Sequence, residues 1–233
     1  MKIAYTGLNL PEGKTKINDP VFAAMVEKFK PLKVSPYFFE FLPDGYEQAD
    51  AIVIAADRML DLLIHDMEKL ETRLERSGGD DGVEETELLR KCLSHLEEEK
   101  PICDLALEDE EKPIVHGLGF LSNTPTLTHE GGTVDIDTLC PAVMAKAGVM
   151  FFYTAGKEEV HAWFVKAGAS AVDCAERIHT DLAKGFVKAE IVSFEDLMTA
   201  HSIADARSKG LTQLVDRGYV IEENTILEIR FTG

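Results

Sequence analysis

The sequence predicts two successive folding units, an α/β unit followed by an α+β unit. Residues 51–56 are a continuous apolar run, which is typical of a strand buried inside a parallel sheet. Residues 57–99 carry two stripes of apolar residues at helical spacing, separated by a glycine-rich stretch. Residues 149–231 combine short strand patterns with a helical pattern, which predicts a small mixed sheet with a helix packed on one face.

The chain begins with a short strand that runs into a glycine-containing segment. Residues 1–6 (Met-Lys-Ile-Ala-Tyr-Thr) have a strand pattern and are followed by Gly7 and, further on, by Gly13-Lys14-Thr15. A strand that feeds such a segment ahead of a helix is the context of a phosphate-binding P-loop. In that loop, backbone N–H groups surround the phosphates, the lysine neutralises them and the hydroxyl reaches Mg²⁺.

The same segment departs from the P-loop motif in two ways. The motif has four residues between its glycines, whereas five stand here, and one of them is Glu12. Pro20 also interrupts the helix whose amino-terminal dipole should face the anion. We identify Gly13, Lys14 and Thr15 as candidates for the phosphates of ATP or GTP, and Thr15 for Mg²⁺. The alternative is a vestigial loop that only connects two elements.

Helix and strand patterns continue through the first unit. A helix is expected over residues 21–29, and strands over 37–42 and 51–56. Residues 57–99 predict an antiparallel helical hairpin, with residues 77–82 as its glycine-rich turn. Its two apolar stripes are Met59, Leu62, Leu63, Met67, Leu70 and Leu74, and Leu88, Leu89, Cys92, Leu93 and Leu96.

The last third of the chain predicts a hairpin, a helix and further strands. The hairpin strands are expected at residues 149–154 and 160–165, and one helix is expected over 171–184, before a glycine suited to the end of a helix. Alternating patterns at 188–194 and 227–231 predict two more strands. This order of elements is β-grasp-like.

Large aromatic residues of this last third are expected in its core. Trp163, Phe186 and Phe231 would supply the apolar area that a small sheet-and-helix layer must bury. Residues 179–181 (His-Thr-Asp) are adjacent at a helix end and point in different directions, so they do not indicate a catalytic triad.

The composition predicts a soluble globular protein with a strong acidic balance. The 233 residues are 45% hydrophobic and carry 24 Lys and Arg against 42 Asp and Glu, a formal net charge of −18. A field of this sign repels a phosphate backbone, so we expect no binding to DNA, and any contact with RNA must use a local basic patch. No apolar run approaches the roughly 20 residues of a membrane span, and no signal-peptide pattern opens the chain. We therefore expect a cytoplasmic protein with no membrane partner.

The cysteines predict reduced thiols. The four residues, Cys92, Cys103, Cys140 and Cys174, lie far apart and form no Cys-x-x-Cys pair. Neither a zinc site nor a disulfide framework is indicated.

Several short segments of the last third form a recognisable series. In chain order they are Thr154-Ala155-Gly156-Lys157-Glu158-Glu159-Val160, Ala162-Trp163, Ile178-His179-Thr180-Asp181, Lys184-Gly185-Phe186 and Ala189-Glu190. This series resembles the C-terminal TGS-type domain of the YchF (Obg-like) ATPases, P-loop proteins of the translation-factor class. The resemblance implies a β-grasp domain that contacts RNA, a ribosome or a translation-related protein. The candidates for that contact are Lys157, Lys184 and Lys188.

The rest of the chain resembles the family in part. Residues 70–76 and 93–101 resemble its coiled-coil insertion. Family members carry an Asp-x-x-Gly element that senses the terminal phosphate, whereas this chain offers Asp44-Gly45 and Asp57. Residues 128–132 (Thr-His-Glu-Gly-Gly) stand where the family has its Asn-x-x-Glu base-recognition motif, and they contain no asparagine. The resemblance therefore implies a shortened, degenerate nucleotide-binding domain.

Together these patterns predict three segments and one principal function. Residues 1–57 and 100–146 would form a truncated P-loop-like α/β domain, 58–99 an inserted, coiled-coil-like helical hairpin, and 147–233 a TGS-type β-grasp domain. The expected function is a non-catalytic binding or regulatory module for a ribosome, RNA or protein partner. One alternative is a weak P-loop ATPase or GTPase that works as a nucleotide-controlled switch. Another is a structural protein whose acidic hairpin mediates self-association.

Overall fold

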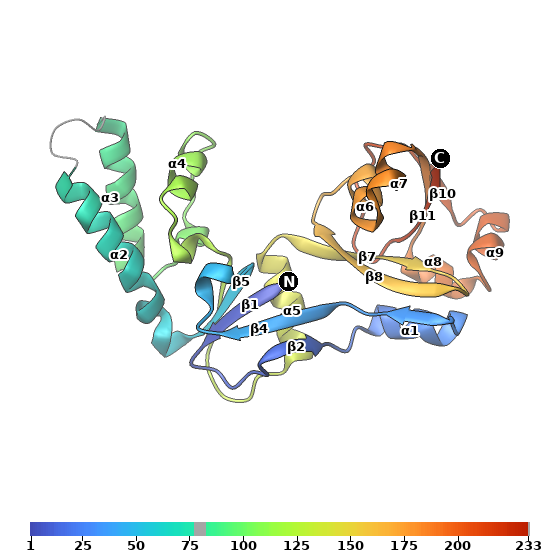
Figure 1. Cartoon of the computed structure of the whole chain (residues 1–233), viewed down its shortest axis with the longest axis horizontal. Coiled ribbons are helices and arrows are strands. Elements are labelled where there is room, and N and C mark those ends of the chain that lie inside the picture. The colour runs from blue at the N-terminus through green and yellow to red at the C-terminus, as the bar shows by residue number, and fades with distance from the viewer. Residues whose placement is uncertain (77–82, 233) are drawn as a thin grey trace. The chain divides into compact units, whose positions relative to one another are not determined.

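The computed structural model describes residues 1–76 and 83–232, and its chain divides into two compact units (Figure 1). Unit 1 contains Met1–Thr15 and Phe39–Ala147, and unit 2 contains Lys16–Phe38 and Gly148–Gly233. The expected boundaries kept residues 1–57 in one domain. The contacts of Lys16–Phe38 instead make this segment part of the C-terminal unit, and the expectation is corrected accordingly.

Unit 1 is built on a sheet with the strand order β2-β4-β1-β5-β6. Strand β1 pairs in parallel with β4 on one side and with β5 on the other, and β5 pairs in parallel with β6. All five residues of β5 are buried, so the continuous apolar run at 51–56 is a central parallel strand, as predicted. The strands are β1 (Lys2–Thr6), β2 (Gly13–Lys16), β4 (Phe38–Pro43), β5 (Ala51–Ala55) and β6 (Thr126–His129).

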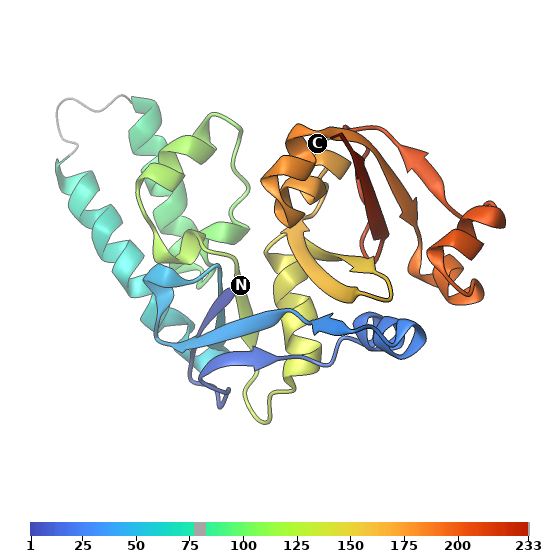
Figure 2. The ribbon, with the colours of Figure 1, turned by 45° about the vertical axis from the view of Figure 1, so that its right-hand side comes forward.

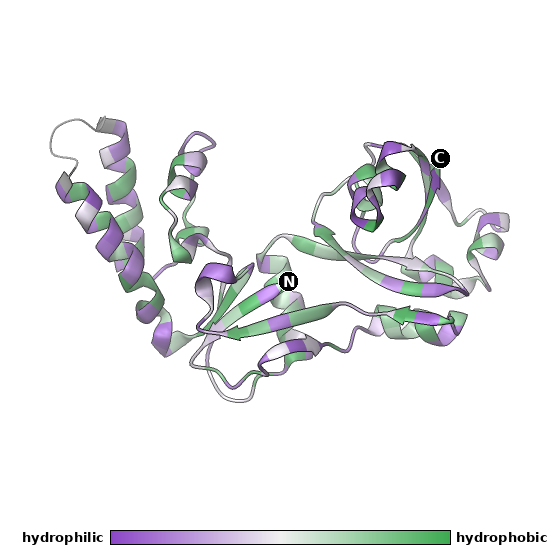
Figure 3. Cartoon of the chain, in the orientation of Figure 1, coloured by the Kyte–Doolittle hydropathy of each residue, from purple (hydrophilic) through white to green (hydrophobic). Residues whose placement is uncertain are grey.

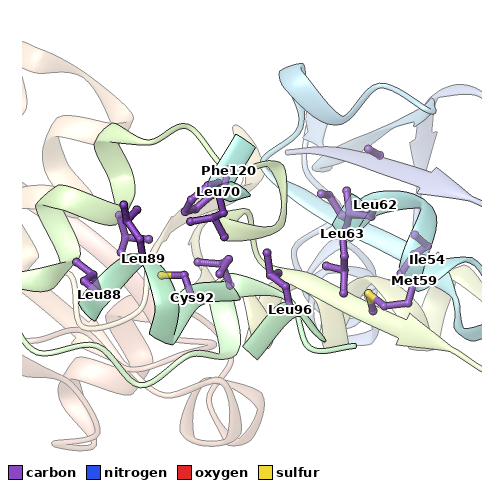
Figure 4. Close-up of a cluster of buried hydrophobic side chains, with 14 residues drawn as sticks. Ile54, Met59, Leu62, Leu63, Leu70, Leu88, Leu89, Cys92, Leu96 and Phe120 are labelled. Carbon is purple, nitrogen blue, oxygen red and sulfur yellow. The ribbon is translucent and has the colours of Figure 1, made fainter. Parts of the chain in front are cut away.

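Two long helices cover one part of this sheet. Helices α2 (Met59–Arg76) and α3 (Val83–Glu97) share a buried cluster with Ala4 and Ile54 of the strands (Figure 4). The cluster contains the apolar stripes read from the sequence, because helical spacing brings each stripe to one face. The expected turn at residues 77–82 lies outside the described residues. Helix α5 (Ile136–Lys146) packs against β5 and β6.

Short elements join these helices to the sheet. They include a 3-10 helix, η4 (Leu121–Asn123), whose start is held by a side chain from α2. The Asp66 carboxylate is fully buried and accepts the N–H groups of Leu121 (2.9 Å) and Ser122 (2.8 Å). A buried carboxylate needs such donors to offset its lost hydration. The other short elements are η1 (Tyr46–Gln48), η2 (Ala56–Arg58), η3 (Ile102–Asp104) and α4 (Glu111–Gly117).

Unit 2 contains a mixed sheet with the strand order β10-β9-β11-β7-β8-β3. Strands β7 and β8 form the antiparallel hairpin that the sequence predicts, and β11 pairs in parallel with β7 and antiparallel with β9. The short strand β3 pairs in parallel with β8 and extends the sheet with a segment from far upstream. The strands are β3 (Lys33–Ser35), β7 (Val149–Ala155), β8 (Glu159–Lys166), β9 (Phe186–Val192), β10 (Gln213–Val215) and β11 (Ile226–Phe231).

Helices cover both faces of the β7–β8 hairpin. Helix α6 (Ala171–Ile178) shares a buried cluster with Phe152, and helix α1 (Pro20–Phe29) packs against β7 and β8. The turned view shows α6 (orange) and α1 (blue) on opposite sides of the hairpin (Figure 2). Phe151 and Phe164 lie on the opposite face of the hairpin from Phe152, because successive strand residues alternate between faces. Their rings contact the ring of Tyr37, which lies in the segment Lys16–Phe38.

The helix expected over residues 171–184 is interrupted, and that prediction is wrong. His179 is extended (φ −164°, ψ 136°) and separates α6 from a short helix, α7 (Thr180–Lys184). Its Nδ1 accepts the Asp181 N–H at 3.2 Å, so the side chain caps the second helix. Capping of α7 therefore explains the arrangement of residues 179–181.

Two further details differ from the sequence patterns. The strand expected at 188–194 lies at residues 186–192, because Ser193 caps helix α8 (Phe194–Thr199), which helix α9 (Ile203–Ser208) follows. Phe231 was expected in the core, but it is 52% exposed near the chain end.

Hydropathy follows this architecture. Figure 3 shows hydrophobic colour along β1 and β5, and both colours on α2 and α3, as amphipathic helices require. No helix in the described ranges combines the length and the apolar character needed to cross a bilayer.

Candidate functional site

The carboxyl edge of the unit 1 sheet is the place where its topology favours a ligand. The chain passes from β1 to β4 on one side and then to β5 on the other, so the direction of the connections reverses at β1. In open α/β sheets, ligands bind outside the carboxyl ends of the strands at such a reversal. The residues that follow β1, β4 and β5 are therefore the first candidates.

A polar cluster lies at this edge. The Thr6 hydroxyl, at the end of β1, donates to the carboxylate of Asp44. The Tyr46 hydroxyl donates to the Thr6 Oγ1 at 2.5 Å. Burial raises the pKa of Tyr46, although its hydrogen bond to Thr6 acts in the opposite direction. The phenol therefore stays protonated at neutral pH and keeps its donor role.

Gly7 lets the chain turn directly after β1. Its φ is +72°, and a Cβ there would lie 2.8 Å from the Ala55 Cβ and 2.9 Å from the Arg58 Cγ. Both the backbone conformation and the close approach of β5 require glycine. This glycine is the first residue of the candidate phosphate-binding motif, and it lies at the carboxyl edge as that motif requires.

The other residues of the motif have a different local structure from the one expected. Gly13, Lys14 and Thr15 belong to β2, at one edge of the sheet, and not to a loop in front of a helix. Helix α1 starts only at Pro20, after the cap residue Asp19. The Lys14 side chain is exposed and Thr15 is half-buried. The expected loop geometry is therefore wrong for these residues, and their contact with a phosphate or with Mg²⁺ stays a prediction.

Metal-binding side chains do not gather in the described part of the chain. No group of three or more His, Cys, Asp or Glu side chains there could hold an ion. The four cysteines are free thiols. Burial raises the pKa of Cys92 to about 11 and the pKa values of Cys140 and Cys174 to about 12, so these thiols stay protonated at neutral pH.

The three lysines expected to contact a partner all lie in unit 2. Lys157 is exposed in the turn between β7 and β8. Lys184 ends α7 and lies 3.8 Å from the carboxylate of Asp181. Lys188, in β9, is half-buried and pairs with Asp216. The structure puts them on three different elements.

Charge is divided unevenly between the two units. Unit 1 has 11 basic and 27 acidic residues, a formal charge of −16, whereas unit 2 has 13 basic and 15 acidic residues, a charge of −2. The sequence interpretation missed part of this difference, because it assigned the lysines of α1 and β3 to the first domain. The run Lys28-Phe29-Lys30-Pro31-Leu32-Lys33 is the signal that could have drawn attention to them.

Comparison with known proteins identifies the relatives of the chain. The family described as "YchF-GTPase_C: Protein of unknown function (DUF933)" matches residues 149–232. The chain is similar to the YchF proteins. The "Ribosome-binding ATPase YchF" of Bacillus subtilis is 26% identical over 235 aligned residues, which cover 74% of this chain and 64% of that protein. The protein of the same name from Mycoplasma genitalium is 39% identical over 80 residues, 34% of this chain and 22% of that protein.

A solved YchF structure has the same fold. The Schizosaccharomyces pombe YchF GTPase superposes with a TM-score of 0.80 at 17% identity, covering 99% of this chain and 97% of that one. At this identity the likeness concerns the fold. In sequence, the chain spans just under two thirds of the length of the Bacillus subtilis YchF.

Proposed function

We propose that the protein is a ribosome-associated binding module that docks through unit 2. The observation that carries the proposal is the match of residues 149–232 to the C-terminal family of YchF, a protein named as ribosome-binding in Bacillus subtilis. The matched residues make up most of unit 2, which has its own sheet and helices.

The proposal includes a TGS-type β-grasp assignment for this unit. Its support is the strand order β10-β9-β11-β7-β8, with β11 parallel to β7 at the centre and α6 crossing between β8 and β9. A mixed sheet of this order, with a crossover helix on one face, supports the β-grasp assignment. Strand β3 then extends the sheet beyond β8.

The charge distribution supports unit 2 as the docking unit. A ribosome presents a phosphate backbone, and the field of a unit with a charge of −16 opposes approach to it. Unit 2 is almost neutral, so local clusters of lysine can dominate its surface potential. Lys157, Lys184 and Lys188 are the proposed contacts within it.

The test is co-sedimentation of the full chain with purified Bacillus subtilis ribosomes at several salt concentrations. Exchanging Lys157, Lys184 and Lys188 together for alanine should weaken binding by about tenfold or more at low salt and should flatten the salt dependence. Both effects follow because fewer counterions are released when fewer phosphates are neutralised.

The matched control removes three positive charges from unit 1, by exchanging Lys91, Lys100 and Lys112 for alanine. The proposal requires this variant to lose much less affinity than the unit 2 variant, although its more negative unit 1 can weaken binding slightly. Equal losses in the two triple variants would contradict docking through unit 2, and so would a chain that stays in the supernatant at every salt concentration.

A nucleotide-controlled switch is the second candidate function. Gly7 at the reversal point of the sheet favours it, together with the ATPase activity in the names of the relatives. Gly13, Lys14 and Thr15 are its proposed phosphate contacts, with Mg²⁺ at Thr15. Calorimetric titration with ATP or GTP and Mg²⁺ tests this function. Binding that is lost in Lys14→Ala supports it, and heat-silent titrations of the unmodified chain exclude it.

A further inference from the structure

Helix α2 has one side in the core of unit 1 and another side in solvent. Its buried side includes Leu62, Leu63 and Leu70, which belong to the cluster shared with α3 and the strands (Figure 4). Residues three or four positions apart lie on the same side of a helix. The outer face of α2, as we call it, consists of five exposed residues at this spacing. They are Leu60, Ile64, Glu68, Glu71 and Glu75.

The first half of the outer face is apolar. Leu60 and Ile64 are 45% and 47% exposed, and neither belongs to the buried cluster. They are four residues apart, so their side chains lie next to each other along the helix. Covering them with a second apolar surface is favourable, because it removes their exposed area from water.

The second half of the outer face is acidic. Glu68, Glu71 and Glu75 are exposed and stand three and four residues apart, a spacing at which like charges repel each other. Within residues 1–76 and 83–232, none of these three glutamates forms an ion pair, whereas Asp61 pairs with Arg58. A cation supplied by a partner would relieve the repulsion among the three carboxylates.

Two cations of α2 are already engaged within unit 1. The Lys69 Nζ donates to the carbonyl oxygen of Gly119 at 2.9 Å and lies 3.9 Å from the buried carboxylate of Asp66. Arg73 pairs with Glu85 of α3. Both lie outside the ridge of the outer face, and unit 1 as a whole has a charge of −16. Such a field attracts a cationic partner and repels an anionic one.

We propose that the outer face of α2 binds a helical segment of a partner protein that has apolar side chains at one end and lysine or arginine at the other. The apolar end packs on Leu60 and Ile64, and the basic end pairs with the three glutamates. From Leu60 to Glu75 the face is about 22 Å long, the length of a helix of about four turns. A second helix presents side chains at the same repeat, so it matches both halves at once. The proposal does not depend on docking through unit 2.

The test measures the fluorescence anisotropy of three labelled helical peptides, each titrated with the full chain at low salt. The lysine peptide is alanine-based, with two leucines in its first half and three lysines in its second half. The glutamate peptide has glutamates in place of the lysines, and the alanine peptide has alanines in place of the leucines. We expect saturable binding of the lysine peptide, and affinities that are about tenfold lower for the other two peptides.

Charge reversal tests the acidic half. Glu68→Lys combined with Glu71→Lys should lower the affinity for the lysine peptide by about tenfold or more and raise the affinity for the glutamate peptide, because the facing charges change sign. The matched control combines Glu108→Lys with Glu110→Lys, two exposed residues just before α4, and changes the net charge equally. The control should keep the preference for the lysine peptide.

Truncation tests the apolar half. Leu60→Ala combined with Ile64→Ala should lower the affinity for the lysine peptide by about fivefold and leave the affinity for the alanine peptide unchanged, because that peptide has no leucines to lose contact. The matched control combines Val187→Ala with Leu214→Ala, which shortens two side chains of unit 2 that are also about half exposed. Both affinities should stay unchanged in this control. Urea unfolding verifies that every variant keeps its fold.

Four results would overturn the proposal. Equal effects of the two charge-reversed variants would mean that net charge alone attracts the lysine peptide. A lysine-peptide affinity that is unchanged by Leu60→Ala with Ile64→Ala would mean that the apolar half makes no contact. The third result is a chain that binds none of the peptides. The fourth is a chain that self-associates in sedimentation experiments and becomes monomeric in Leu60→Ala with Ile64→Ala, because a second copy would then cover the face.

Discussion

Glu190, in β9, is a carboxylate enclosed by two arginines. Its side chain is 2% exposed, and its oxygens accept hydrogen bonds from Arg207 (2.7 and 2.6 Å) and from Arg230 (2.7 Å). The hydrogen bonds from Arg207 are the largest cause that lowers the pKa of Glu190 to about 2. This side chain therefore ties α9 and β11 to β9.

The lowered pKa predicts an acid-sensitive contribution to stability. Since the folded pKa lies below the unfolded value near 4.5, the contribution is complete above pH 4.5 and is lost as the pH falls toward 2. Glu190→Gln should lower the free energy of unfolding by about 2 kcal/mol at pH 7, a figure reduced for the half-exposed arginines. The difference from the unmodified chain should be smaller at pH 3.5, as measured by urea denaturation.

Glu228→Gln is the control for that prediction. Glu228 also accepts from Arg207, at 3.2 Å, but its side chain is 53% exposed. An exposed pair contributes less than about 1 kcal/mol, so this variant should change little at either pH. An unfolding difference for Glu190→Gln that is the same at pH 7 and pH 3.5 would argue against the proposed linkage.

Sequence patterns do not find a contact of this kind. Alternation correctly identifies β9 as a strand, but it assigns Glu190 to a face without saying what covers it. The partners are 17 and 40 residues away along the chain, beyond the reach of any local period. The same limit explains Phe231, because its apolar character does not show which residues pack on it, and its side chain is 52% exposed.

At the scale of elements, Asp19 connects the start of α1 to the sheet of unit 2. Its Oδ1 accepts the N–H groups of Val21 (2.9 Å) and Phe22 (3.0 Å), so it caps the helix. Its Oδ2 accepts the hydroxyl of Tyr153, which is 1% exposed in β7, at 2.7 Å. Asp19→Ala removes the cap and leaves a buried phenol without its acceptor.

We expect Asp19→Ala to cost about 2 to 3 kcal/mol of unfolding free energy, from about 1 for the cap and the rest for the unpaired hydroxyl. Tyr153→Phe should cost about 1 kcal/mol, and the double variant less than the sum of the two. Asp135→Ala is the matched control, because Asp135 caps α5 through Asp137 and should cost about 1 kcal/mol. Strict additivity of the Asp19 and Tyr153 changes in urea unfolding would refute the coupling.

This cap also explains why the loop structure expected at Gly13, Lys14 and Thr15 is wrong. The sequence gives the strand, the glycines and the lysine, and these features locate β1 and Gly7 correctly. A phosphate-binding loop also needs a helix to begin at its end. Pro20 and the Asp19 cap start α1 five residues after Thr15, so Gly13–Lys16 is left free to pair as the edge strand β2. The spacing of the glycines and the lysine alone cannot show whether these residues form a loop or an edge strand.

Across the two units, segments that follow one another in the sequence do not all belong to the same unit. Periodicity predicted β1, β4, β5, β7, β8, β9 and β11 and the helices α1, α2 and α3, because each period records which residues face a core. It did not predict the short strands β2, β3, β6 and β10 or helix α5. Periodicity did not predict that Lys16–Phe38 belongs to unit 2, because this depends on which of the two cores buries its apolar residues. Phe22 and Met25 of α1 are buried, and Tyr37 stacks on Phe164 at 5.1 Å between ring centres.

That membership predicts how the C-terminal unit behaves when it is cut out. A fragment of residues 148–233 lacks α1 and β3, so the face of Phe151 and Phe164 and the edge of β8 are uncovered. Each apolar side chain whose burial is lost costs about 1.5 to 3 kcal/mol, so the free energy of unfolding of the fragment should be several kcal/mol lower than that of a matched chain.

The matched chain joins residues 16–38 to 148–233 through a flexible Gly/Ser linker in place of unit 1. Urea unfolding and the dispersion of amide resonances compare the two. If the 148–233 fragment were as stable as the linked chain and its amide resonances were equally dispersed, residues 148–233 would form a stable domain without Lys16–Phe38.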